Sequence, residues 1–249
     1  MSAQRFIPIL TYHQIAPEPA KGTAFRSLCV SPERFKSQML WLKRCGFQAL
    51  SMRDLMPYLR GEKAARVVGV TFDDGYENNL THALPVLAQL GFTSTVYAVS
   101  AMLGASNTWD AHLGIAPSQL MSEQDLITWH QSGQEVGSHT EHHVHLTEIS
   151  LTDAQREIER SKRRLESLLQ ASVNQFCYPY GQFNAEMARM VRAAGYEAAT
   201  TTQRSRVKVV EGVNEPDVFA LPRVPIVRST MWPQFLLKTL TAYEDRRGP

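Results

Sequence analysis

The sequence predicts an α/β fold, a distorted seven-stranded (β/α)7 barrel of the TIM-like type. Short runs rich in β-branched and aromatic residues alternate with helical patterns along most of the chain, which is typical of parallel strands joined by crossover helices. The predicted strands cover residues 6–12, 67–72, 93–99, 134–138, 174–178, 196–200 and 223–227. No repeat, low-complexity tract or linker divides the 249 residues, so a single domain over 1–249 is expected.

Capping residues and stop residues place helices between these strands. Three helices are predicted in this way: one from Ser31-Pro32 to Gly46, one starting at a capping box of Thr152 and Gln155, and one from Asn184 to Gly195. Pro85 lies inside the apolar segment 80–90, so the helix there is expected to begin late or to kink. Residues 104–119 have no clear period and are expected to leave the barrel as a long loop, and 201–217 are expected to be irregular.

The composition argues against several classes of protein. A net charge of +2 and a pI near 8.4 are too mild for a nucleic-acid groove. The three cysteines are widely spaced, so no disulfide framework or cysteine zinc site is expected, and they are interpreted as reduced bystanders. No apolar stretch approaches the roughly 20 residues of a transmembrane helix. The protein is expected to be cytoplasmic if its N-terminus is native and extracytoplasmic if an export signal has been removed.

Two adjacent carboxylates, Asp73 and Asp74, follow the predicted strand 67–72 directly. Parallel α/β folds place their active sites at the carboxyl ends of the strands. Neighbouring side chains leave a strand in different directions, so one acid can bind a metal while the other faces substrate or water. An acidic turn with a purely structural role is the alternative, because Asp-Asp-Gly is also favourable in turns.

Four histidines lie within seven residues, directly after another predicted strand: His139, His142, His143 and His145. Such a cluster favours metal binding over separate structural roles. Their spacing leaves the ligand pair open among His139 with His143, His139 with His142, and His142 with His145. The sequence 176–181, Phe-Cys-Tyr-Pro-Tyr-Gly, ends a third strand and by itself is typical of a turn. The three loops together indicate a metal-dependent hydrolase.

These motifs resemble the NodB-type polysaccharide deacetylases of carbohydrate esterase family 4. Thr71-Phe72-Asp73-Asp74-Gly75 is similar to the first motif of that family, and 138–143 is similar to its second. The resemblance implies that Asp73 is the general base, that Asp74, His139 and His143 hold one divalent metal ion, and that the Tyr180 amide faces the oxyanion. Zinc is expected first, and the mixed carboxylate and imidazole ligands also suit cobalt, nickel or iron.

The sequence departs from the commonest members of the family at two places. They carry an arginine before the third motif, where Cys177 and Tyr178 stand here, and Arg223 is the candidate substitute. They also take a catalytic-acid histidine from a C-terminal motif, but no histidine follows His145 in this chain. The opening strand is similar to the poly-β-1,6-N-acetylglucosamine deacetylase branch, in which the acid comes first. His13 is therefore the predicted general acid, with a merely polar strand-end residue as the alternative.

The predicted activity is hydrolysis of the acetamide of N-acetylglucosamine-type saccharides, with Trp109 and Asp110 of the 104–119 loop lining the sugar site. Action of the same metal site on another amide or on an O-acetyl ester is one alternative. A catalytically silent saccharide-binding protein is another, although binding alone would not need the base Asp73. The apolar stretch 232–237 is expected to form a closing helix packed on the barrel.

Overall fold

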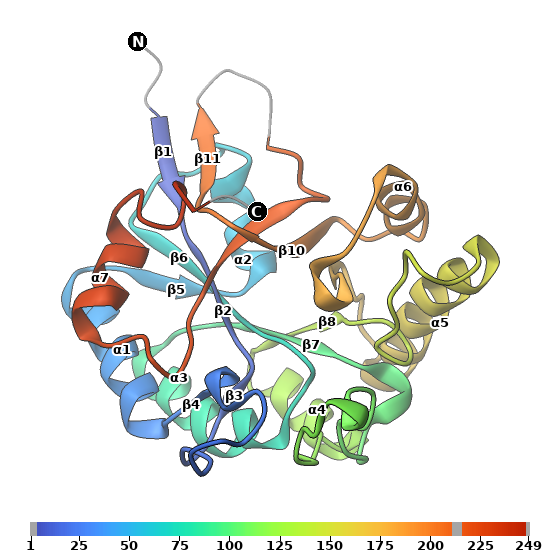
Figure 1. Ribbon diagram of the computed structural model, residues 1–249. Helices are drawn as coiled ribbons and strands as arrows, with labels where there is room; N and C mark the ends of the chain where they lie inside the picture. Colours follow the sequence, from blue (N-terminus) through green and yellow to red (C-terminus); the bar gives the residue numbers. More distant parts are fainter. Residues whose placement is uncertain (1–3, 211–215, 248–249) are drawn as a thin grey trace.

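The computed structural model describes residues 4–210 and 216–247 (Figure 1). Its strands are β1 (Gln4–Ile7), β2 (Ile9–Tyr12), β3 (Gln14–Ile15), β4 (Cys29–Val30), β5 (Gln48–Leu50), β6 (Val67–Phe72), β7 (Thr95–Ala98), β8 (Glu135–Ser138), β9 (Gln175–Cys177), β10 (Ala198–Arg204), β11 (Val207–Val210) and β12 (Leu221–Pro225). Its α-helices are α1 (Pro32–Arg44), α2 (Met52–Leu59), α3 (Leu84–Leu90), α4 (Glu123–Gln131), α5 (Leu151–Leu169), α6 (Ala185–Ala193) and α7 (Trp232–Leu240).

Seven parallel strands close into a barrel, which confirms the predicted fold class. They follow the order β2, β12, β10, β9, β8, β7 and β6, and the pairing of β2 with β6 completes the circle. Closure brings β2 beside β6, with Leu10 opposite Val70. Every residue of β2 and β6 is buried, as expected for strands covered on both sides by core and helices. The carboxyl ends of all seven strands therefore open at the same end of the barrel.

Four of the described strands were not predicted, namely β3, β4, β5 and β11, and one predicted strand is divided. β5 pairs with the first half of β6, and its Ala49 carbonyl accepts the Thr93 amide, so it lies between β6 and the start of β7. The predicted strand 6–12 is interrupted at Pro8, since proline has no N–H to give to a sheet. β1 thus leaves the barrel while β2 enters it.

The expectation of an irregular stretch at 201–217 is wrong for the part that the structure describes. β10 continues to Arg204, and β11 pairs antiparallel with β1, placing Gln4 opposite Val210. The buried Val207 and Val209 lie on either side of the exposed Lys208, the pattern of a strand with one covered face. The rest of that prediction, at 211–215, lies outside the described residues.

Local capping signals located α1 and α6 correctly, but not α5. Ser31 accepts the Arg34 amide at the start of α1, and Asn184 caps α6. The predicted capping box of Thr152 and Gln155 is wrong, because Ser150 begins α5 two residues earlier and accepts the Asp153 amide at 3.1 Å. A π-helical turn over Asn79–Ala83 comes first, and α3 itself begins only at Leu84, directly before Pro85. This agrees with the expected late start.

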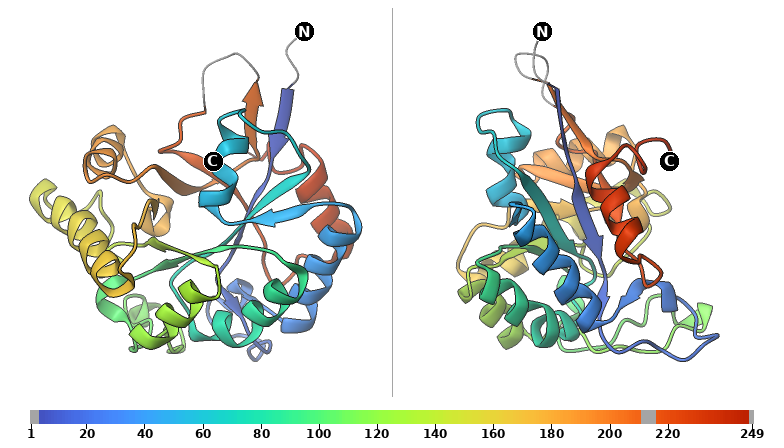
Figure 2. Two further views of the ribbon diagram at one scale, coloured as in Figure 1. Left: turned by 180° about the vertical axis from the view of Figure 1, so that it is seen from behind. Right: turned by 90° about the vertical axis from the view of Figure 1, so that its left-hand side faces the viewer.

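The long loop predicted at 104–119 leaves the barrel and returns through two isolated antiparallel bridges, Tyr76 with Leu120 and Ser106 with Gln119. Figure 2 shows this green segment and the blue loop after β2 at the same end of the molecule. The predicted closing helix is α7, whose buried Phe235 packs against Trp41 of α1. Within 4–210 and 216–247, no helix has the length and apolar character needed to cross a bilayer. The cellular location stays a prediction.

Candidate active site and metal centre

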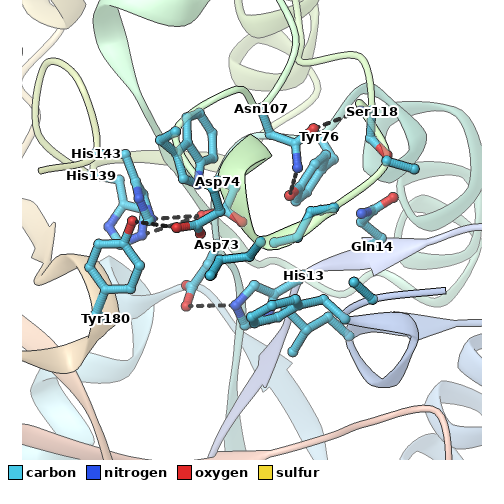
Figure 3. A pocket seen from close by; sticks show the side chains of 18 of the residues that line it. His13, Gln14, Asp73, Asp74, Tyr76, Asn107, Ser118, His139, His143 and Tyr180 are labelled. Atoms are coloured by element: carbon cyan, nitrogen blue, oxygen red, sulfur yellow. Dashed lines mark hydrogen bonds and ion pairs between the residues drawn. The ribbon is translucent and has the colours of Figure 1, made fainter. Parts of the chain in front are cut away.

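The two adjacent acids leave the end of β6 in different directions. The Asp73 amide donates to the Tyr12 carbonyl at 3.0 Å, which continues the β2–β6 pairing one residue beyond the strand. Asp74 then adopts φ 72° and Gly75 φ 78°, so the chain turns sharply. In Figure 3 the Asp74 carboxylate faces His139 and His143, whereas that of Asp73 faces His13. The dipeptide thus supplies two carboxylates to two different sets of partners.

Asp74 is the centre of a buried group with two histidines. Its Oδ1 lies 3.5 Å from His139 Nε2 and 3.3 Å from His143 Nε2. His139 is fixed by its other ring nitrogen, because Nδ1 lies 2.8 Å from the Cys177 carbonyl oxygen, which can only accept a hydrogen bond. Nε2 of a neutral His139 therefore keeps its lone pair directed at Asp74.

These three residues fit a divalent metal ion. Their ligand atoms all lie within 4.8 Å of one another, and all three residues are buried. The bond from His139 to a backbone carbonyl is the outer contact that metal-binding histidines usually make. One carboxylate with two imidazoles suits zinc, cobalt, nickel or iron. Of the three histidine pairs that spacing left open, the fold assembles His139 with His143.

The other two histidines of the cluster lie outside this group. His142 is half-exposed and its Nδ1 lies 2.7 Å from Glu157 of α5. His145 stacks on the Tyr180 ring, with centroids 3.7 Å apart and an angle of 2° between the planes. Neither ring approaches Asp74 in the way that His139 and His143 do.

Asp73 is held by a bidentate ion pair with Arg223 of β12. The two guanidinium nitrogens lie 2.7 Å and 2.8 Å from its two oxygens, and both side chains are almost fully buried. His13, at the end of β2, brings Nε2 to 3.9 Å from Asp73 Oδ2. Burial alone would raise the pKa of Asp73, but the charge of Arg223 and that of a protonated His13 outweigh it and hold the pKa below its usual value. Asp73 is thus kept ionised and oriented.

Cys177 lies where the sequence placed no function. Its thiol is buried, 3.2 Å from an Arg223 nitrogen and 3.8 Å from Asp73 Oδ1. Its backbone carbonyl is the acceptor for His139, as described above. All three cysteines are free, as expected, and Cys177 contacts both halves of the site. Alternation along β9 was the available signal, because it directs Cys177 to the face opposite the Phe176 side chain.

Aromatic side chains pack against His143 of the Asp74, His139 and His143 group. Trp109 stacks on the His143 ring at 4.5 Å between centroids, and Tyr180 meets the same ring edge-on at 4.7 Å. The Tyr180 hydroxyl donates to Asp110 Oδ1 at 3.0 Å, which ties the β9 loop to the 104–119 loop. The predicted saccharide-site residues Trp109, Asp110 and Tyr180 are thus brought together, while their roles stay predictions.

Tyr76 and Asn107 also belong to the site, although no individual role was predicted for either residue. Tyr76 follows the Asp-Asp-Gly motif and is buried, and its hydroxyl accepts a hydrogen bond of 3.0 Å from Asn107. Asn107 in turn accepts the Ser118 amide at 2.6 Å, which closes the 104–119 loop on itself. Asn107 belongs to residues 107–110, the part of the loop that was expected to line the sugar site.

The group opens into a cavity of about 750 Å³. That is within the roughly 300–1,000 Å³ of typical small-molecule sites. The cavity is lined by His13, Asp73, Asp74, His139, His143 and Tyr180, together with residues between β3 and β4 and residues of the 104–119 loop. Arg223 does not line the cavity, so it binds Asp73 from the side that faces away from the cavity. A closed parallel barrel with acids and histidines gathered at its strand ends has the architecture of a barrel hydrolase.

Comparison with known proteins identifies the family. Residues 60–199 match the family model described as polysaccharide deacetylase, which is more than half of the chain. The chain therefore belongs to the polysaccharide deacetylase family, and the resemblance seen in the sequence motifs is confirmed.

Individual relatives are distant but cover most of the chain. YxkH of Bacillus subtilis strain 168, whose name assigns it provisionally to the polysaccharide deacetylases, is 28% identical over 88% of this chain and 71% of its own length. The poly-beta-1,6-N-acetyl-D-glucosamine N-deacetylase of Staphylococcus epidermidis is 22% identical over 89% of this chain and 75% of its own. The crystal structure of BC0361, a polysaccharide deacetylase from Bacillus cereus, superposes with a TM-score of 0.78 and 26% identity, covering 95% of this chain and 69% of that one.

Proposed function

We propose that this protein is a metal-dependent N-deacetylase of N-acetylglucosamine-type saccharides. One observation carries the proposal: a carboxylate clamped by Arg223 stands beside a second carboxylate that faces two histidines. Asp74, His139 and His143 would hold one divalent ion, with zinc as the first expectation. Such an ion, when bound, supplies Lewis acidity to the amide carbonyl and lowers the pKa of a water molecule. The family and the name of the Staphylococcus epidermidis relative support this substrate class.

The residues of this chain provide the proton transfers. Asp73 accepts a proton from the attacking water as oxygen bonds to the acetamide carbon, and Arg223 keeps Asp73 ionised and pointed at the cavity. The Tyr180 backbone N–H stabilises the negative oxygen of the tetrahedral intermediate. His13 donates a proton to the leaving nitrogen as the carbon–nitrogen bond breaks. The products are acetate and the free amine of the sugar.

Two alternatives keep the same site with a different outcome. The site would also suit another amide or an O-acetyl ester, because the reaction at the carbonyl is the same. A saccharide-binding protein without activity would have no need of Asp73. The bidentate ion pair with Arg223 argues against that second alternative. A buried ion pair of this kind holds Asp73 in one position, which serves a general base but is not needed for binding a saccharide.

Amine release from N-acetylglucosamine oligomers, both β-1,4 and β-1,6 linked, tests the proposal. Metal-stripped protein is assayed with and without added zinc or cobalt, beside an Asp73→Asn variant. We expect metal-dependent release that the variant loses, while the variant still binds metal because Asp73 is not one of the three ligands. Tight metal binding with no amine release from any oligomer would favour another acyl substrate. Release that is independent of metal would refute the proposed mechanism.

A further inference from the structure

We propose that Glu157 of α5 is a positioning residue for the metal centre, which it serves by holding the loop that carries His139 and His143. This inference rests on the proposed function, since it concerns the same site. Glu157 touches neither histidine ligand. It acts through the backbone between them, at Glu141 and His142.

Three hydrogen bonds join Glu157 to this loop. One carboxylate oxygen, Oε2, accepts the amide N–H groups of Glu141 and of His142, each at 2.9 Å. The other oxygen, Oε1, lies 2.7 Å from His142 Nδ1. The Glu157 side chain is only 13% exposed, so these contacts form largely out of water. Hydrogen bonds to an ionised acceptor are roughly twice as strong as those between neutral groups.

The loop needs this support because its backbone is strained. Thr140 has φ 65° and His143 has φ 58°, and such a conformation is a genuine outlier for a β-branched residue such as threonine. Strained residues of this kind persist only where the surroundings over-determine them. The turn therefore depends on the contacts made by its neighbours.

Contacts on both edges of the loop account for its shape. On one edge, the amides of Ser100 and Ala101 donate to the carbonyls of Thr140 and Glu141, at 3.1 Å and 2.9 Å. On the other edge, Glu157 binds the amides of Glu141 and His142. The His143 amide is bound within the loop by the Thr140 hydroxyl. From outside the loop, the Glu157 side chain thus binds the amide N–H groups of Glu141 and His142, the two residues directly before His143.

Glu141, His142 and Glu157 also bring ligand atoms within 4.8 Å of one another, which could suit a cation. The contacts favour the positioning role instead. Both oxygens of Glu157 already have close partners, and His142 is half-exposed. Binding of a second ion here is therefore treated as an outcome that the experiment must be able to detect.

The test compares Glu157→Ala and Glu157→Gln with a matched control, Glu159→Ala. Glu159 lies on the same helix and carries the same charge, but it contacts Gln155 and Arg163 and not the loop. Zinc and cobalt affinity and stoichiometry are measured by competition with a chromophoric chelator, together with the visible spectrum of bound cobalt. Amide hydrogen exchange across 138–146 is measured in the metal-free proteins, beside the melting temperature.

We expect Glu157→Ala to weaken metal binding by about 10–100-fold, the usual loss when a contact outside the ligand set is removed. It should also alter the cobalt spectrum and speed exchange at Glu141 and His142. Glu157→Gln keeps an amide oxygen that can accept both N–H groups, so it should restore affinity to within about threefold. Glu159→Ala should behave as the wild type.

Three results would overturn the inference. Wild-type affinity and spectrum in Glu157→Ala, with a lower melting temperature alone, would show a merely structural role. A second bound ion that Glu157→Ala loses would make the cluster a cation site. An equal loss in Glu157→Gln and Glu157→Ala would assign the effect to charge. If the wild type binds no metal, the proposed function fails, whatever the variants show. In that case hydrogen exchange still tests the positioning role, which unchanged exchange at Glu141 and His142 in Glu157→Ala would overturn.

Discussion

Replacing Arg223 with methionine removes the partner of a buried charge. Asp73 loses two bonds of 2.7 Å and 2.8 Å, and the His13 imidazole stands 3.9 Å away from it. The Thr201 carbonyl also loses the bond of 2.8 Å that it accepts from Arg223. Removing one partner of a buried ion pair costs about 3–5 kcal/mol, because the other charge is left without compensation. We expect a loss of this size in the free energy of unfolding at neutral pH.

Urea denaturation of the metal-free proteins measures this loss, and two further variants identify its cause. Asp73→Asn combined with Arg223→Met has neither buried charge of this pair, so it should recover at least about 2 kcal/mol of the loss. Arg223→Lys keeps the positive charge but cannot form two parallel bonds, and it should be intermediate. The reasoning is refuted if Arg223→Met unfolds at the same urea concentration as the wild type, or if the double variant is no more stable than the single one.

The ion pair also sets the direction of a pH effect on stability. The pKa of Asp73 is lower in the folded protein than in the unfolded chain, so the stabilisation is present above the unfolded value near 3.9. It is lost as the pH falls through the folded value. In Arg223→Met the burial of Asp73 is no longer outweighed, so its pKa rises. The acid limb of the activity profile should then move to higher pH, because the base acts only when ionised.

Two other predictions concern Glu135 and Tyr180. Burial raises the pKa of Glu135 to about 7, against the opposing bonds from Thr95 and the Arg53 amide, so the folded state holds the proton more tightly than the unfolded chain. The free energy of unfolding should therefore fall by about 3 kcal/mol as the pH rises from about 4.5 to about 7. Glu135→Gln should lack this decline when urea unfolding is compared at pH 5 and pH 8. Equal declines in the variant and the wild type would contradict this reasoning. Tyr180→Phe removes the hydroxyl bond to Asp110 but keeps the backbone N–H, so kcat should fall by less than about tenfold, since losing an oxyanion donor costs about 10²–10³. A hundredfold loss in steady-state kcat would assign the reaction step to the phenol instead.

Much of the barrel could be predicted because its strands are marked locally. The run 67–72 is buried at every position, and the residues that follow it are the acids of the site. Cap residues located α1 and α6 for the same reason, since a cap acts within one turn of its helix. α5 shows the limit of such signals. Ser150 and Thr152 are both acceptable caps by residue type, and only the geometry of the preceding loop selects Ser150.

The contacts that hold the site together could not be predicted from spacing alone. Arg223 and Asp73 are 150 residues apart, and they meet because β12 and β6 both flank β2 once the barrel closes. The bond of His139 to the Cys177 carbonyl similarly depends on β8 lying beside β9. Arg223 could be proposed from the sequence only because this chain lacks the arginine that the commonest members of the family carry before the third motif. Glu157 carried no such signal, since it is one of several acids on a long charged helix.

Backbone strain explains how two adjacent acids come to serve different partners. Among the described non-glycine residues, six have positive φ, and four of them lie at this site: Asp74, Thr140, His143 and Tyr180. Asp73 still follows the strand and therefore meets Arg223, but the left-handed turn at Asp74 directs its carboxylate to the histidines. A residue with ordinary φ after Asp73 would continue toward the opposite face of the sheet. Because these strained positions belong to three separate loops, the barrel must hold each loop independently. The candidate ligands Asp74, His139 and His143 are thus positioned by the whole scaffold, and contacts outside these three residues should also affect metal binding.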